Sequence, residues 1–547
     1  MPGVIFHRLG RPGRTVKKIK LNDISRNTIE PLARLSPEDL LPLPPPYDKT
    51  APFKTLSAEQ QKRYVSNLDG FIALNLPVPK GKAEEQKYVS QFIEGLHKLL
   101  SRENNWTFLQ PLLLSLEHCV NCQTCSQACP VYTASGRNEI YRPTYRAEIF
   151  RRLVNKYARK GGKFFSKVNG ADVGLNWGVI SRLYELSYRC TLCRRCAQAC
   201  PIGVDNGLLT RELRKLFSQE LGWAPPELHE KGTVLQLTTG SPTGMRPAVA
   251  VDNIKFLDSD YSEQTGMNVE TPWDKEGADI LLLHSAGDIL AFPESIVAFS
   301  ILCNAAGLSW TLSSEISGYD GANYGIFYDD IQLAKIAFRH TEAAKKLKVK
   351  KIVVGECGHE HKALLTVADR LLPPQLNIPR ENAISFLENI VFSGKIQFDT
   401  TKNNFPVTLH DPCNIVRNLG IVEPQRRILR FICPQFREME PHGIDNFCCG
   451  GGGGLGLISG VNFEEWRVNI AGRVKFKQVL ETFSDVPNPE VKKYVCAPCL
   501  NCKLQFREIF TYFKAREKSG LYCGGMAELI VNAMAEIKKP FITWGGQ

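Results

Sequence analysis

Residues 118–130 read HCVNCQTCSQACP and residues 189–201 read RCTLCRRCAQACP, so both stretches follow the pattern C-x2-C-x2-C-x3-C-P. Three thiolates spaced three residues apart can surround one metal–sulfur cluster from a single tight loop. The fourth cysteine, which precedes a proline, reaches a neighbouring cluster. The spacing therefore predicts two cubane [4Fe–4S] clusters, whose ligands are expected to be Cys119, Cys122, Cys125 and Cys200 for one, and Cys190, Cys193, Cys196 and Cys129 for the other.

Zinc is the alternative metal for these cysteines. It takes four ligands, usually as two separated pairs, and two matched runs of four cysteines fit that arrangement poorly. The first 20 residues are polar and basic, without an apolar signal segment. No apolar run approaches the roughly 20 residues that span a bilayer. We therefore expect a cytoplasmic protein that uses its cysteines for metal binding or redox chemistry, and any membrane contact to come from a partner.

Composition and charge narrow the class of protein further. The 547 residues are 43% hydrophobic and 23% charged, which is typical of a globular protein. A chain of this length forms roughly two to four domains. The net charge of +12 favours an acidic partner or an anionic membrane surface. No nucleic-acid-binding motif accompanies that charge, so nucleic acid is not expected as a partner.

Changes in pattern divide the chain into four parts. The first part, residues 1–105, has no cysteine and contains two expected helices, near residues 58–68 and 83–102. Its second helix carries an apolar face that we expect to pack on the protein's own core. The parts are an N-terminal extension, an α-helical ferredoxin domain and two further units, at residues 1–105, 106–240, 241–400 and 401–547.

The last two parts repeat one pattern. Each opens with an apolar run that ends in Leu-His, at residues 280–284 and 407–410. Each later contains a β-rich run that ends in cysteine, at residues 352–357 and 494–499. Strands that alternate with helices predict α/β units with parallel sheets. The expected fold class is α plus α/β, a helical ferredoxin domain followed by two pseudo-repeated units with helices at residues 292–306, 332–347, 423–431 and 464–483.

A second group of cysteines lies in the last part. Two of its members, Cys448 and Cys449, are adjacent and precede five glycines at residues 450–454. Adjacent cysteines point in different directions and suit a site with several irons, while glycines let backbone N–H groups approach thiolate or sulfide charge. A phosphate-binding loop is the rival reading, but no Gly-Lys-Ser/Thr follows. The other members of the group are Cys413, Cys496, Cys499 and Cys502.

The pattern C-x34-CC-G…C-x2-C resembles the cysteine-rich CCG domain of heterodisulfide reductase catalytic subunits. The resemblance implies a catalytic non-cubane [4Fe–4S] cluster, bound by five cysteines, that acts on disulfide-type substrates. Carried over residue by residue, it implies Cys413, Cys448, Cys449 and two of Cys496, Cys499 and Cys502 as ligands. Cys499 and Cys502 match the family's terminal pair better, which leaves Cys496 as a possible additional ligand.

The first α/β part departs from that pattern. Gly287 stands where Cys413 would be, and Asn323-Tyr324 stand where the double cysteine would be. Only Cys357 remains, within GECGHEH at residues 355–361. This half is expected to bind no cluster of its own. As an alternative to a pure scaffold, its Cys357, His359 or His361 could face the cluster of the other half as a ligand or proton donor. The matching strand-end residues His284 and His410 are interpreted as structural.

The order of parts, with residues 355–361 and 446–454, resembles the DsrK family of iron–sulfur subunits in the DsrMKJOP membrane complex. The resemblance covers nearly the whole chain from about Leu116 onward. It implies a membrane cytochrome b partner (DsrM-like), the other DsrMKJOP subunits, and the small sulfur carrier DsrC as a disulfide or trisulfide substrate in dissimilatory sulfur metabolism. An acidic carrier would be attracted by a basic surface, for which Arg417 is a candidate.

Two other functions stay open. One is an electron-transfer subunit of a glycolate-, lactate- or glycerol-3-phosphate dehydrogenase-type complex, which also combines two cubanes with CCG domains. Such subunits usually keep cysteines in both halves, so Gly287 and Asn323-Tyr324 count against this function. The other is a non-catalytic electron conduit.

Overall fold

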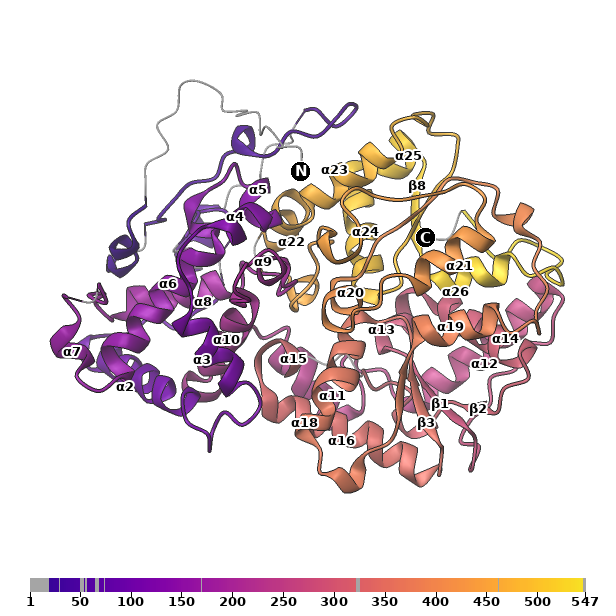
Figure 1. Cartoon of the computed structure of the whole chain (residues 1–547), viewed down its shortest axis with the longest axis horizontal. Coiled ribbons are helices and arrows are strands. Elements are labelled where there is room, and N and C mark those ends of the chain that lie inside the picture. Colours follow the sequence, from indigo (N-terminus) through magenta and orange to yellow (C-terminus); the bar gives the residue numbers. More distant parts are fainter. Residues whose placement is uncertain are drawn as a thin grey trace.

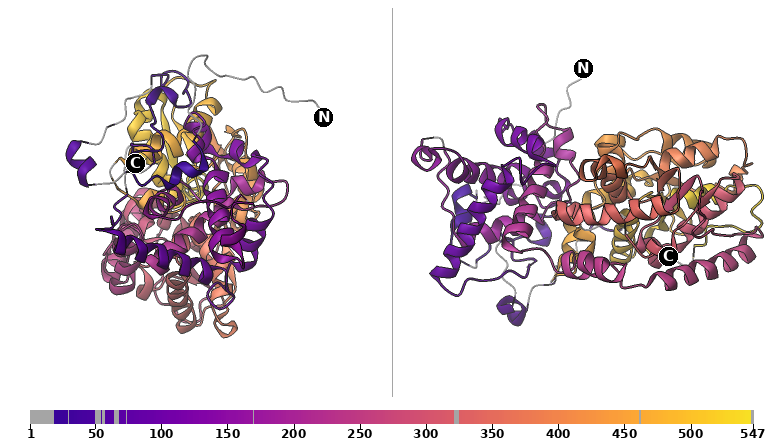
Figure 2. Two further views of the ribbon diagram at one scale, coloured as in Figure 1. Left: turned by 90° about the vertical axis from the view of Figure 1, so that its left-hand side faces the viewer. Right: turned by 90° about the horizontal axis from the view of Figure 1, so that it is seen from below.

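The chain forms a helical body, which extends to the end of helix α10 (Asn206–Leu221), and this body packs against two α/β units, as the computed structural model shows (Figure 1). Viewed from below, the helical body is a lobe beside the α/β units (Figure 2). The structure describes residues 19–544 with the exception of 29, 50–53, 55–56, 64–67, 73, 169, 321–324 and 461.

The N-terminal extension is part of the helical body. Its helices are α1 (Ala58–Arg63) and α2 (Lys82–Leu99). Val89, Phe92 and Leu96 of α2 are buried, and α2 packs along α10 (Asn206–Leu221), as the apolar face of the sequence predicts. The two helices approach closely at Gly95, where a Cβ atom would lie 2.8 Å from Cγ of Leu216.

The two four-cysteine motifs, at residues 118–130 and 189–201, adopt the same local backbone. In each, the residues on either side of the second cysteine have left-handed φ angles, 54° and 66° at Asn121 and Gln123, and 52° and 60° at Leu192 and Arg194. These turns wrap the loop before a short helix begins. The short helices are α4 (Thr124–Ala128) and α9 (Arg195–Gln198), and α4 is followed by α5 (Pro130–Ala134).

The strands of the described residues form two parallel sheets of four strands each, with the orders β2-β1-β3-β4 and β6-β5-β7-β8. Parallel sheets fit the expected α/β class. The central strands match the predicted apolar runs, whereas the short outer strands were not predicted. The strands are β1 (Ile280–Leu283), β2 (Trp310–Thr311), β3 (Lys351–Val354), β4 (Arg380–Asn382), β5 (Val407–Leu409), β6 (Phe436–Arg437), β7 (Lys493–Cys496) and β8 (Leu521–Gly524).

Helices join the two α/β units into one body. A single hydrophobic core contains residues of both sheets, such as Leu282 and Leu409. No helix among the described residues is both long and apolar enough to cross a membrane. The pairs that pack across the units are α14 (Pro293–Ala305) with α26 (Met526–Asn532), and α19 (Ala383–Val391) with α21 (Pro424–Ile432).

Of the two remaining predicted helices, one is continuous and the other is interrupted. The stretch at residues 332–347 is α16 (Asp330–Lys346). The stretch at residues 464–483 is not one α-helix, because a π-helical turn at Arg467–Ala471 separates α22 (Phe463–Trp466) from α23 (Arg473–Thr482). The Gly472 N–H donates to the Arg467 carbonyl at 2.7 Å where the turn ends.

The ends of three strands place cysteines on one side of the α/β units. Cys357 follows β3, Cys413 follows β5, and Cys499 follows β7. Because the carboxyl ends of parallel strands share one edge of a sheet, ligand sites in open α/β folds form there. The two sheets therefore direct these cysteines toward a common region.

A buried arginine fastens the N-terminal extension to the helical body. Arg182, on α8 (Trp177–Ser187), is fully buried. Its guanidinium donates hydrogen bonds of 2.9–3.1 Å to five backbone carbonyls, those of Asp23, Ile24, Arg26, Thr28 and Glu30.

We predict that Arg182→Ala lowers the free energy of unfolding by about 3 kcal/mol, because it leaves buried carbonyls without a donor. Limited proteolysis of the variant should cleave within residues 19–30 sooner than in the wild type. Arg339→Ala removes only an exposed pair with Glu342 and should change stability by less than about 1 kcal/mol. Equal stability of the two variants, measured by denaturant unfolding, would contradict the prediction.

Candidate metal centres

Four predicted ligands surround one cavity in the helical body. Its wall contains Cys119, Cys122 and Cys125 from the first motif and Cys200 from the second. The backbone N–H of Val204 donates to Sγ of Cys200 at 3.3 Å. Because Cys122 is exposed, this cavity lies at the surface of the helical body.

The other four predicted ligands surround a second cavity, with Cys190, Cys193, Cys196 and Cys129 in its wall. Arg146, on α6 (Pro143–Leu153), lines the same cavity and donates from Nη2 to Sγ of Cys190 at 3.2 Å. Burial lowers the pKa of this guanidinium, but the thiol groups around it outweigh burial and raise it. A buried cation thus faces the thiols of this cavity, where it would offset thiolate charge. The structure brings together the two sets of four cysteines that the spacing predicts.

The cysteines of the last part meet those of two other segments in a third group, buried between the α/β units. Cys449 contacts Cys448 and Cys502, and Cys448 also contacts Cys413. Cys499 contacts Cys502 and also Cys357, which belongs to the first α/β unit. We call Cys357, Cys413, Cys448, Cys449, Cys499 and Cys502 the six-thiol site.

The six-thiol site also touches the second cavity. Cys193, in the wall of that cavity, contacts Cys448. Thiols therefore follow one another without interruption from the helical body into the interface of the α/β units. Sequence reasoning missed this contact, because Cys193 and Cys448 lie in motifs that have no common pattern.

Hydrogen bonds from neighbours favour thiolate at two of the six positions. The thiols of Cys448 and Cys502, followed by His410, hold the pKa of the Cys449 thiol well below its usual range. Cys357 and Cys502, followed by His359, do the same for the pKa of Cys499. A backbone N–H group adds to this at Cys499, since Gly358 N lies 3.2 Å from its Sγ.

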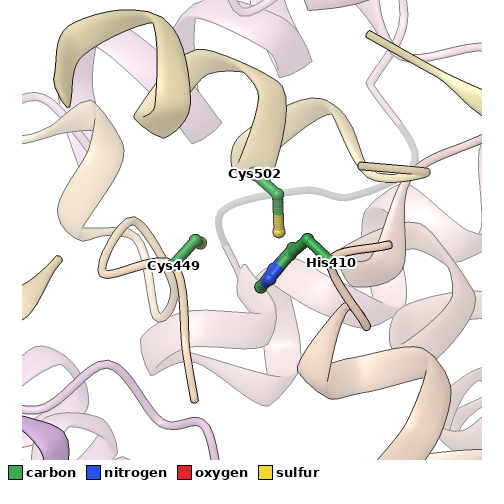
Figure 3. Close-up of side chains that lie close together, drawn as sticks. All are labelled: His410, Cys449 and Cys502. Carbon is green, nitrogen blue, oxygen red and sulfur yellow. The ribbon is translucent and has the colours of Figure 1, made fainter. Parts of the chain in front are cut away.

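His410 lies beside the thiols of this site. It follows β5. One of its ring nitrogens and the sulfurs of Cys449 and Cys502 all lie within 4.8 Å of one another. Figure 3 shows the three side chains pointing toward a common point, with Cys502 on a helix and Cys449 on a loop. His410 also packs edge-on against Phe506, so the structure places it beside the thiols without excluding the structural role predicted for it. His284, its counterpart, packs edge-on against Phe299 and contacts no thiol among the described residues.

The first α/β unit contributes two of its three candidate groups. Cys357 and His359 both contact Cys499, and Nδ1 of His359 lies 2.8 Å from Nδ2 of Asn501. His361 instead accepts the N–H of Ala383 at its Nε2, at 3.1 Å, and serves the fold.

Two further sequence expectations concern cysteine positions. Cys496, the spare cysteine, lies on β7 within the hydrophobic core and contacts no thiol of the six-thiol site among the described residues. Gly287 packs against Leu500, and a Cβ atom there would lie 2.6 Å from Cδ2 of that side chain. Asn323 and Tyr324 lie outside the described residues.

A lysine that the sequence did not indicate lies beside the thiols. Lys475, on α23, is fully buried and donates to Oδ1 of Asn446 and Oε1 of Gln478. Burial lowers its pKa to about 7, while Asp411, Cys449 and Cys448 act in the opposite direction. A cation here would stabilise negative charge on the adjacent cysteines.

The glycines at residues 450–454 serve mainly to let another loop approach. One backbone N–H, that of Gly450, reaches a thiol as the sequence predicts. Gly452 and Gly453 instead pack on the loop of the second cysteine motif, residues 189–201. Cβ atoms added there would lie 2.7 and 3.0 Å from the carbonyl oxygen of Thr191.

Arginine side chains bind the two loops together. Arg214 donates to the carbonyl of Gly453 at 2.6 Å and to that of Cys190 at 2.8 Å. Arg417 donates to the carbonyls of Cys193 at 3.0 Å, Ile444 at 2.7 Å and Asn446. Arg417 is buried, so the expectation that it forms part of a docking surface was wrong. Its side chain satisfies carbonyls between the second cavity and the six-thiol site.

The donor chemistry of all three sites fits iron–sulfur clusters. The described walls of the first two cavities contain four thiols each and no carboxylate, which is the ligand set of a cubane. The third site gathers six thiols from several segments, more than the four ligands that one zinc ion takes. Soft thiolate donors in that number fit a centre with several irons.

Comparisons with known proteins agree with this chemistry. Residues 115–204 match the model of a 4Fe-4S dicluster domain, and residues 407–507 match that of a cysteine-rich domain. The chain is 26% identical over 490 residues to Hdr-like menaquinol oxidoreductase iron-sulfur subunit 2 of Archaeoglobus fulgidus, covering 81% of this chain and 83% of that protein.

Two other relatives show the same similarity. The Hdr-like menaquinol oxidoreductase iron-sulfur subunit of Archaeoglobus profundus is 27% identical over 77% of this chain and 79% of its own length. A dihydromethanophenazine:CoB--CoM heterodisulfide reductase subunit of Methanosarcina acetivorans is 25% identical over 68% of this chain and 86% of its own length. These similarities support an iron–sulfur, electron-transferring subunit of an Hdr-like oxidoreductase.

We predict that Gly453→Ala separates the second cubane loop from the six-thiol site. The substitution adds a Cβ at 2.9–3.0 Å from Thr191 and Leu192 to a residue with φ of 65°, and should lower the free energy of unfolding by about 3 kcal/mol. Gly394→Ala is the matched control, because Gly394 has φ of 74° but open space around it. It should cost about 1 kcal/mol. Thermal unfolding that shifts equally in both variants would argue against the packing role.

Proposed function

We propose that this chain is a DsrK-like catalytic subunit of a membrane-bound respiratory redox complex in dissimilatory sulfur metabolism. In this proposal two cubane clusters and one non-cubane cluster connect a DsrM-like cytochrome b subunit with a disulfide or trisulfide substrate, the sulfur carrier DsrC. The ligands would be the two sets of four cysteines for the cubanes, and Cys413, Cys448, Cys449, Cys499 and Cys502 for the non-cubane centre. The chain would lie on the cytoplasmic side of the membrane.

The observation that carries the proposal is the uninterrupted contact of thiols from Cys193 to Cys357. It supports a path in which electrons enter at the first cavity, near exposed Cys122, and leave at the six-thiol site. When bound, the clusters would supply one-electron carriers along that path. The residues of the chain supply fixed spacing, because arginine side chains hold the loops on either side of Cys193 and Cys448.

Reduction of a disulfide needs protons as well as electrons, since RSSR′ + 2 e⁻ + 2 H⁺ gives RSH + R′SH. The site offers polar hydrogens beside its thiols. Nδ1 of His359 lies 2.8 Å from Nδ2 of Asn501, and the His359 ring contacts Cys499. Lys475 and His410 lie on the Cys449 side. These groups would stabilise thiolate and hold protons close to where sulfur–sulfur bonds are cleaved.

We predict that Cys448→Ala removes the third centre and spares the other two. Anaerobically purified wild type should contain about 12 irons per chain and the variant about 8, because the variant lacks one of the five proposed cysteine ligands of the third cluster. The variant should lose viologen-linked disulfide reduction while the cubane signals in electron paramagnetic resonance remain.

The matched control is Cys303→Ala, which truncates a buried cysteine of α14 that contacts no other thiol among the described residues. It should keep the iron content, the spectrum and the activity. If the wild type contained only about 8 irons per chain, the protein would be an electron conduit without a third cluster. Full iron without reduction of any disulfide would favour a dehydrogenase-type electron-transfer subunit.

A further inference from the structure

The two most exposed large apolar side chains among the described residues lie at one turn of the helical body. Val168 is 88% exposed and Phe164 is 83% exposed, and Phe165 beside them is 55% exposed. The ring of Phe164 meets that of Phe165 edge-on, with centroids 5.0 Å apart. We call residues 159–168, which contain the short helix α7 (Gly162–Phe165), the tip. Figure 1 shows α7 at the end of the helical body that lies away from the α/β units.

Hydrogen bonds and close packing fix the shape of the tip. The N–H of Phe165 donates to the carbonyl of Gly161 at 3.1 Å, and that of Val168 donates to the carbonyl of Phe165 at 3.0 Å. Gly162 packs so closely that a Cβ atom there would lie 2.0 Å from the carbonyl oxygen of Asn155. An ordered turn therefore holds the apolar side chains outward.

Basic side chains surround these apolar groups. Residues 156–168 contain five basic and no acidic side chains. Two of the five are paired, Lys156 with Asp172 at 2.9 Å and Arg159 with Glu117 at 3.1 Å. The tip thus combines apolar side chains with positive charge that is only partly compensated. The other three basic residues are exposed and form no ion pair with the described residues: Lys160, Lys163 and Lys167.

An anionic lipid surface matches this combination better than a protein does. Aromatic rings and lysines occupy the headgroup region of a bilayer, because the rings reach the acyl chains while the ammonium groups stay with the lipid phosphates. Each lysine close to an anionic leaflet adds to the attraction. A stable protein interface takes roughly 20 residues or more from each side, which a single turn does not offer. An isolated apolar tip with a basic rim is therefore suited to lipid.

We propose that the tip inserts Phe164, Phe165 and Val168 into the headgroup region of a membrane that contains anionic phospholipid. The lysines of the tip would lie at the level of the lipid phosphates. This inference goes beyond the proposed function and does not depend on the disulfide chemistry of the six-thiol site. The sequence assigned membrane contact to a partner, whereas here the chain adds a lipid contact of its own.

Contact at the tip would also bring the first cavity close to the bilayer. Thr144, in the wall of that cavity, lies at the start of α6, and α6 with the π-helical turn Val154–Ala158 leads from there to the tip. A helix rises about 1.5 Å per residue, so this path is roughly 20 Å long. Arg159 of the tip pairs with Glu117, two residues before Cys119. The lipid contact would therefore hold the point of electron entry within reach of a membrane-embedded redox partner.

The test is flotation of the full-length, iron-loaded protein with phospholipid vesicles, without any partner protein. The wild type should bind vesicles of about one-third phosphatidylglycerol in phosphatidylcholine at least about tenfold more strongly than vesicles of phosphatidylcholine alone. Phe164→Ser/Phe165→Ser should weaken this binding at least about tenfold, because it removes the rings that enter the lipid.

The matched control is Val249→Ser/Phe256→Ser, which should bind vesicles as the wild type does. These side chains are 48% and 70% exposed on α12 (Pro247–Thr265), which lies on the other side of the molecule from α7 (Figure 1). Both double variants should keep the iron content of the wild type, so that a loss of binding is not a loss of fold.

Charge variants test the contribution of the lysines. Lys160→Gln/Lys163→Gln should lower the preference for phosphatidylglycerol at least about fivefold, and about 0.5 M salt should remove most of the preference of the wild type. Lys335→Gln/Lys539→Gln, at two exposed lysines elsewhere on the chain, should leave the preference unchanged.

Two outcomes would overturn the inference. If the wild type bound neither kind of vesicle, the tip would be a contact for a protein partner instead. If the serine variants at residues 164 and 165 and those at residues 249 and 256 bound vesicles equally, the lipid contact would lie elsewhere. Both outcomes leave the proposed function intact, because iron content and disulfide reduction test it separately.

Discussion

The contact between Cys193 and Cys448 is the constraint on which the rest of the structure depends. Electron tunnelling weakens steeply with distance, so a relay between two sites works only while the loops that hold them keep a fixed separation. The helical body and the α/β units are separate lobes, and lobes of that kind move relative to each other unless their interface is rigid. Here the interface is rigid because glycines without side chains admit the cubane loop, and Arg214 and Arg417 satisfy carbonyls on both sides of it.

A second set of buried charges fixes the two α/β units behind the thiols. Lys503 lies 3.3 Å from Asp288 of the other unit. Glu356 accepts two backbone N–H groups at the start of α26, each at 2.9 Å, and burial raises its pKa to about 7. Because Glu356 directly precedes Cys357 and Lys503 directly follows Cys502, the network determines where two of the six thiols lie. Polar groups buried this deeply add little stability but define one arrangement of the units.

The sequence predicted the chemistry better than it predicted the geometry. Cysteine spacing and short apolar runs are local properties, so the sets of four thiols and the central strands followed from them. The six-thiol site is assembled from distant segments, and nothing in the alternation of residues 407–410 distinguishes a histidine that faces thiols from one that packs in a core. Arg417 was misjudged for a related reason, since a charged residue is normally exposed unless specific acceptors surround it. Its acceptors are backbone carbonyls, which leave no trace in the sequence.

The difference between the two α/β units follows from the same packing. The position of Gly287 corresponds to that of Cys413, but the side chain of Leu500 occupies the space beside it. Leu500 begins α24 (Leu500–Phe513), the helix that carries Cys502, and its N–H donates to the carbonyl of Glu356 at 2.9 Å. A side chain at position 287 would therefore require the Leu500 side chain, which lies two residues before Cys502, to move. The first unit can contribute to the six-thiol site only from its other strand end, where Cys357 lies.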